Sequence, residues 1–138
     1  MKRPKLKEKR SSVRLNFEVP LTYTEMLRYF WLLRKRGKQK MGIATKPSMY
    51  GIRVCGDDAF TEGHDLEMNV ELNKIGLGQP CTIQGEILWT RFNPKTGKHE
   101  AGLQIYDTGK GMKLWKHAIA LKLRSFENEK RDERFDPV

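Results

Sequence analysis

The sequence predicts a mostly β protein, built as a small barrel or sandwich and followed by one C-terminal helix. From Met41 onward, short apolar runs alternate with turn residues at the spacing typical of such folds. After residue 107 the apolar period changes from two to that of an amphipathic helix. A chain of 138 residues has the size of one ordinary domain. We therefore expect a single domain with one core.

Six segments have the character of strands. The clearest is residues 65–72, "DLEMNVEL", in which every second residue is apolar and the residues between are polar. The other five are residues 15–23, 41–45, 52–55, 81–92 and 99–107. Pro20 indicates an edge or a bulge in the first strand, and Gly85 a bulge or a close approach in the fifth. The loop "NPKTG" predicts that the last two strands form an antiparallel hairpin.

The segment between the first two strands is ambiguous. Thr22 and Glu25 have the spacing of a capping box, and Gly37 is a helix stop signal. One face of such a helix would carry Met26, Tyr29, Phe30 and Leu33. A strand also suits "LRYFWLL". We favour an inserted helix near residues 23–36 and keep the strand as the alternative.

The two ends of the chain differ. Residues 1–14 are rich in lysine and arginine, and we expect them to form a flexible basic tail. Residues 108–127 predict a helix whose apolar stripe packs on the barrel or on a partner. This stripe consists of Met112, Trp115, Ile119, Leu123 and Phe126, widened by Leu114, Ala118 and Leu121. Residues 128–138 are expected to be a charged tail.

Composition narrows the classes of function. The formal net charge is 27 − 17 = +10, which implies anionic partners. The chain has no apolar run long enough for a membrane span and no signal-peptide pattern, so we expect a cytoplasmic protein. Cys55 and Cys81 are expected to be structural free thiols, and the three histidines lack metal-site spacing. With no catalytic constellation either, we expect neither an enzyme nor a metal or cofactor.

Four motifs follow one another in a recognisable order. They are "RSSVR" at residues 10–14, "KPSMYG" at 46–51, "GEILW" at 85–89 and "GLQI" at 102–105. This order resembles the PilZ domain, whose pattern is RxxxR, [D/N]xSxxG, a G-x-hydrophobic-x-W strand and a G-hydrophobic-x-F strand. The resemblance covers roughly residues 8–107. It implies a six-stranded antiparallel β-barrel of residues 15–107 with a C-terminal helix, and binding of the bacterial second messenger cyclic diguanylate (c-di-GMP).

The resemblance also assigns roles to residues. Arg10 and Arg14 would clamp phosphate and guanine, because the guanidinium fork pairs bidentately with both. Lys9 would add a phosphate contact. Ser48 would hydrogen-bond a guanine or a phosphate, and Gly51 would let the backbone approach closely. Ordering of the arginine-bearing tail by the ligand would then act as a conformational switch.

Two positions depart from the family pattern. Ile105 replaces a phenylalanine, which is a benign core exchange. Lys46 replaces an aspartate or asparagine that can accept hydrogen bonds from guanine, and lysine has donors only. Lys46 can still contact a phosphate, O6 or N7. The lost contact is expected to weaken binding about ten- to a hundred-fold, or to abolish it.

Three functions are compatible with these features. The first is a c-di-GMP receptor and adaptor that regulates motility, surface attachment or polysaccharide output through an unknown downstream protein. The second is a degenerate PilZ domain that binds protein and no nucleotide, motivated by Lys46. The third is a basic β-barrel that binds nucleic acid, motivated by the net charge and "RKRGKQK". The strands lack an aromatic stacking row, which makes the third the weakest.

Overall fold

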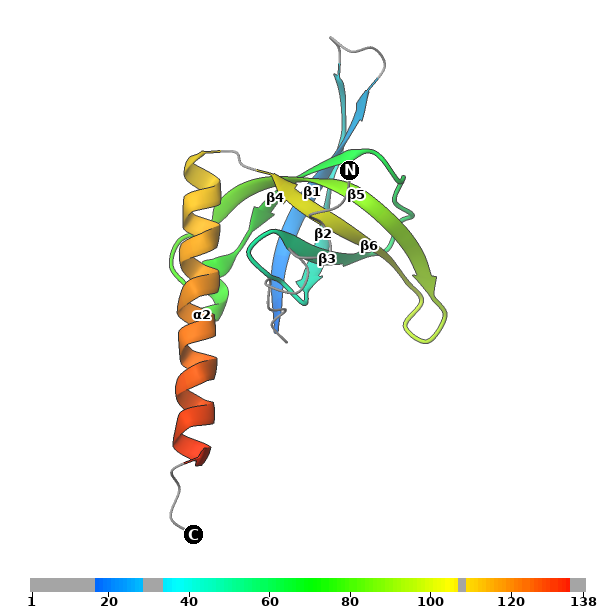
Figure 1. Cartoon of the computed structure of the whole chain (residues 1–138). Helices are drawn as coiled ribbons and strands as arrows, with labels where there is room; N and C mark the ends of the chain where they lie inside the picture. Colours follow the sequence, from blue (N-terminus) through cyan, green and yellow to red (C-terminus); the bar gives the residue numbers. More distant parts are fainter. Residues whose placement is uncertain (1–16, 29–33, 107–108, 135–138) are drawn as a thin grey trace, which may run out of the picture.

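The chain folds into a closed six-stranded barrel with a helix at its C-terminal end (Figure 1). The computed structural model describes residues 17–28, 34–106 and 109–134. The strands are β1 (Glu18–Arg28), β2 (Arg34–Thr45), β3 (Gly51–Gly56), β4 (Asp65–Val70), β5 (Cys81–Asn93) and β6 (Lys98–Tyr106). They follow the order β1-β2-β3-β6-β5-β4, and every neighbouring pair is antiparallel. The predicted fold class is confirmed.

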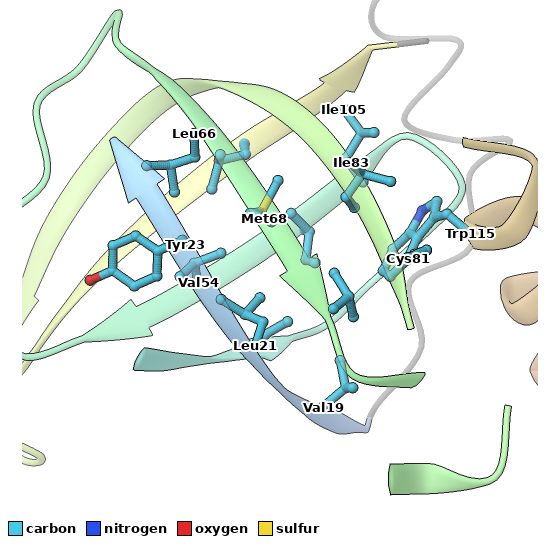
Figure 2. Close-up of a cluster of buried hydrophobic side chains, with 14 of the residues drawn as sticks. Val19, Leu21, Tyr23, Val54, Leu66, Met68, Cys81, Ile83, Ile105 and Trp115 are labelled. Atoms are coloured by element: carbon cyan, nitrogen blue, oxygen red, sulfur yellow. The ribbon is translucent and has the colours of Figure 1, made fainter. Parts of the chain in front are cut away.

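Alternate residues of each strand fill the barrel, as the period of two predicted. In β4, Leu66, Met68 and Val70 are fully buried. Figure 2 shows these side chains meeting those of the other strands in one cluster. Gly85 provides a close approach, since a Cβ there would lie 3.0 Å from the carbonyl oxygen of Gln104. The bulge of β5 falls later, between Ile87 and Trp89.

The expected helix near residues 23–36 is wrong. Wherever this range is described it is strand, because β1 and β2 pair with each other as far as Arg28 and Arg34. Beyond its pairing with β4 the hairpin projects from the barrel (Figure 1). The strand conformation lets Tyr23 enter the core, where it packs against Phe60 with the two ring centroids 5.4 Å apart.

Two glycines make room for this tyrosine. A Cβ at Gly42 would lie 2.9 Å from the Tyr23 ring, and one at Gly56 would lie 2.5 Å from its hydroxyl oxygen. Both positions belong to other strands, β2 and β3. The contacts that select strand over helix at residue 23 are therefore not local in the sequence.

Helix α2 (Lys110–Arg134) lies along one end of the barrel and extends past it (Figure 1). It continues seven residues beyond the expected end at residue 127, so much of the predicted charged tail is helical. Met112, Trp115 and Ile119 are buried as predicted, whereas Leu121 is 37% exposed. Gly111 lets the helix approach β5 closely, because a Cβ would overlap the Thr82 carbonyl.

The remaining element is the short 3₁₀ helix η1 (Leu72–Ile75), which connects β4 to β5 and buries Leu72. Within the described ranges, no helix is both long and apolar enough to cross a membrane.

Candidate functional site

The turn between β2 and β3 carries the "KPSMYG" motif and is held by a compact set of hydrogen bonds. The backbone N–H of Ser48 donates to the Gly51 carbonyl at 2.8 Å, and the Ser48 hydroxyl donates to the same oxygen at 3.3 Å. The indole N–H of Trp115 donates to the carbonyls of Ser48 and Met49 at 3.0 and 3.2 Å. Ser48 is 2% exposed. The turn is thereby attached to helix α2.

Lys46 opens this turn in an unusual backbone conformation. Its φ is 47°, and it is the only residue other than glycine with a positive φ in the described part of the chain. Asparagine and aspartate tolerate this left-handed region better than lysine does. The acid or amide that the PilZ pattern has at this position would thus suit the backbone better than lysine does.

Replacing Lys46 by asparagine should therefore stabilise the protein. We expect the free energy of unfolding to rise by up to about 1 kcal/mol, because the left-handed conformation costs asparagine less than lysine. Urea denaturation of both proteins measures the difference. Lys95→Asn, which removes a lysine from the exposed β5–β6 loop, is the control and should change the free energy of unfolding less. A loss of stability in Lys46→Asn would contradict the conformational argument.

A pocket of about 450 Å³ opens beside this turn on the outer surface of the barrel. Its volume is within the usual range for small-molecule sites. Its walls come from the start of β1, the ends of β2 and β3, and the β5–β6 hairpin. The lining residues are Phe17, Glu18, Ile43, Thr45, Lys46, Arg53, Cys55, Thr96, Lys98 and Glu100. Three cations and two carboxylates thus share one concave surface.

Strand register explains why these residues meet. On the outer face, Thr45 pairs with Arg53, which pairs with Gly102, and Gly102 in turn pairs with Trp89. These four form the first row across β2, β3, β6 and β5. Because outward positions alternate along a strand, the next outward row lies two residues away. That second row consists of Ile43, Cys55, Glu100 and Arg91.

Glu100 is the most tightly held residue of the second row. Its Oε1 accepts from both Nε and Nη2 of Arg91, with the Nε contact at 3.0 Å, and its Oε2 accepts from Nδ2 of Asn93 at 3.2 Å. The residue is 6% exposed. Burial raises the pKa of this carboxyl, but the hydrogen bonds from Arg91 and Asn93 outweigh it and leave the pKa below its usual value. Glu100 is therefore an ionised acceptor.

Trp89 lies in the first row with its ring partly open to solvent. It is 37% exposed, and the absent side chain of Gly102 leaves the space that the ring occupies. The guanidinium carbons of Arg53 and Arg91 lie 5.4 and 5.7 Å from the ring centroid. Such cation–π contacts hold both arginines against the barrel surface. The prediction that Trp89 belongs to the core or the barrel surface is consistent with this position.

The predicted site residues fall into three groups. Lys9, Arg10 and Arg14 lie outside the described residues. Lys46 lines the pocket. Ser48 and Gly51 build the adjoining turn and are not among the residues that line the pocket. The ligand roles of all six stay predictions.

Sequence reasoning missed four charged residues of the pocket, namely Glu18, Arg53, Lys98 and Glu100. None belongs to a motif. A signal was present nonetheless, since Arg53 and Glu100 occupy polar positions that alternate with apolar residues in their strands. Which polar positions meet, however, depends on strand order, and strand order is not visible in one sequence.

The described residues contain no group of histidine, cysteine and carboxylate side chains that could hold a metal ion. Cys55 and Cys81 are free, and burial raises the pKa of both, that of Cys81 to about 11. Cys81 is buried, as expected, whereas Cys55 is half-buried and lines the pocket.

Comparison with known proteins supports the fold. No family model and no curated protein matches the sequence. Among solved structures, the inhibitor of motility MotI/DgrA of Bacillus subtilis superposes with a TM-score of 0.59 at 17% identity, over 84% of this chain and 52% of that one. The PilZ domain of YcgR from Escherichia coli, solved with c-di-GMP, gives 0.49 at 12% identity, over 84% and 95%.

The chain has the PilZ-like fold that the motifs predicted, a closed antiparallel barrel of six strands followed by a helix. It spans about half the length of the motility inhibitor that it resembles.

Proposed function

We propose that this protein is a receptor for c-di-GMP and acts as an adaptor without chemistry of its own. The observation that carries the proposal is the pocket beside the "KPSMYG" turn, where three cations and two carboxylates line one cavity. This combination is complementary to c-di-GMP, because the phosphates of c-di-GMP are anionic and its guanines present N–H donors. Cations suit the first and carboxylates the second.

Chain connectivity supports a place for the two motif arginines at the same pocket. Phe17 and Glu18 line the pocket, and Arg14 precedes Phe17 by three residues. A chain spans at most about 3.6 Å per residue, so the Cα atom of Arg14 lies within roughly 11 Å of that of Phe17. Arg10 lies within about 25 Å by the same reasoning. Chain connectivity therefore allows both long side chains to reach a ligand in the pocket, and in our proposal they do so.

Two contacts connect the pocket and its adjoining turn to helix α2, through which ligand binding would be transmitted to a partner. The ammonium of Lys122 on helix α2 lies 5.4 Å from the centroid of the Phe17 ring, at the edge of the pocket. Trp115 attaches the same helix to the β2–β3 turn. A ligand that moves residue 17 or the turn therefore acts on α2. In our proposal this movement presents a changed surface to a downstream protein in the control of motility, attachment or polysaccharide output.

Titration calorimetry with c-di-GMP tests the proposal. We expect saturable binding of the full chain with a Kd in the micromolar range or tighter. A short single-stranded oligonucleotide, titrated at the same ionic strength, serves as the control for a merely basic surface. Absence of heat at high micromolar c-di-GMP would reject the receptor and favour a protein-binding module. Tighter binding of the oligonucleotide would favour the nucleic-acid alternative.

A further inference from the structure

We propose that Glu100 reads the guanine base and so makes the pocket selective for guanine over adenine cyclic dinucleotides. The inference rests on the proposed receptor function and adds the residue that sets its specificity. Glu100 lies on β6, outside every motif that the sequence analysis used. Glu100 lines the pocket together with Lys46, Arg53 and Lys98.

The need for such a residue arises at Lys46. A lysine at this position removes the hydrogen-bond acceptor that the PilZ pattern provides there. The three cations of the pocket offer donors only, so they recognise phosphate oxygens or the acceptor atoms of a base. Guanine also presents two adjacent donors, N1–H and N2–H₂. They require an acceptor in the pocket, and Glu100 and Glu18 are the carboxylates that line it.

Glu100 is better prepared for this role than Glu18. Arg91 and Asn93 fix its carboxylate in one orientation and keep it ionised. Glu18 is exposed, and solvent competes for its hydrogen bonds. A carboxylate oxygen has two lone pairs, and Oε2 of Glu100 accepts one hydrogen bond, from Asn93. Oε2 therefore retains the capacity to accept from a ligand.

The same geometry discriminates against adenine. Adenine presents an acceptor, N1, beside its single amino donor, and an ionised carboxylate cannot donate to N1. Placing the two acceptors together is repulsive and leaves the carboxylate without the second donor that guanine supplies. Sites built around buried hydrogen-bonding groups reject the analogue that lacks the partner by large factors. Selectivity for guanine follows from the charge and orientation of one side chain.

Binding of c-di-GMP and of cyclic diadenylate, measured by calorimetry on the full chain, tests the inference. We expect the wild type to prefer c-di-GMP by about a hundred-fold or more. Glu100→Gln should weaken c-di-GMP binding about ten-fold or more while changing cyclic diadenylate binding little, so the preference falls by the same factor. Glu62→Gln, which neutralises an exposed carboxylate that does not line the pocket, should leave the preference unchanged.

A second variant separates base reading from a structural role. Arg91→Gln breaks the same ion pair but keeps the carboxylate, so we expect the preference to fall less than in Glu100→Gln, because Asn93 still donates to the remaining carboxylate. Equal losses for both ligands in Glu100→Gln, or an unchanged preference, would overturn the assignment while leaving the receptor function in place. A wild type that binds neither dinucleotide would overturn the receptor function, and the role of Glu100 with it.

Discussion

Replacing Arg10 and Arg14 by alanine should each remove most of the affinity for c-di-GMP. A hydrogen bond to a charged group contributes about 1.5–3 kcal/mol, which corresponds to roughly a 10- to 150-fold change in Kd. Both arginines precede the pocket residue Phe17 closely in the chain, and bidentate contacts to phosphate or guanine cannot be replaced by water without loss. Calorimetric titration of each variant measures the loss.

The control has to distinguish specific contacts of the two arginines with the ligand from a general effect of losing one positive charge. Lys113→Ala also removes one positive charge, but from an exposed position on α2, and should change Kd less than two- to three-fold. Lys9→Ala should have an intermediate effect, since it supplies one phosphate contact. If the arginine variants bind as tightly as the wild type, the ligand lies elsewhere on the barrel and the "RSSVR" motif is part of a solvated basic tail.

The strands were predictable wherever one face of a strand is buried. Leu66, Met68 and Val70 alternate with polar residues because their side chains enter the core and those between face solvent. The helix stripe was predictable for the same reason as far as it touches the barrel. Leu121, which only widens the stripe, lies 37% exposed, whereas Leu123 in the stripe itself packs against the core.

The hairpin of β1 and β2 was not predictable from local signals. The capping-box spacing of Thr22 and Glu25 favours a helix, yet both residues are in a strand. The contacts that decide this come from other strands, where Gly42 and Gly56 make room for the ring of Tyr23. Long-range packing overrides local propensity here, as it often does for short segments.

The residues of the candidate site also fall into those that a local sequence pattern reveals and those that it does not. Lys46, Ser48 and Gly51 are close in sequence, so a motif reveals them together. Arg53 and Glu100 meet only because β3 pairs with β6 in this barrel. Pairing of that kind is a property of the closed sheet, and no local pattern records it. A motif therefore locates the turn beside the pocket, while the strand order supplies the pocket's walls and brings Glu100 into them.

Replacing Trp115 by alanine should give the largest loss of stability. The side chain is fully buried between α2 and the barrel, and Figure 2 shows it beside Cys81 in the core cluster. Removing a buried tryptophan costs about 3–5 kcal/mol, because apolar contacts are lost and a cavity remains. For a domain of this size the Tm should fall by roughly 10–20 °C. Thermal unfolding followed by circular dichroism measures the shift.

Two further variants separate packing from the link to the turn. Leu121→Ala shortens a partly exposed side chain of the same helix and should lower the free energy of unfolding by less than about 1 kcal/mol. Trp115→Phe keeps an aromatic ring but loses the N–H that donates to the carbonyls of Ser48 and Met49. It should retain most of the stability of the wild type and bind c-di-GMP more weakly, because the turn beside the pocket loses its attachment to the helix. Unchanged affinity in Trp115→Phe would show that the helix supports the fold without acting on the pocket.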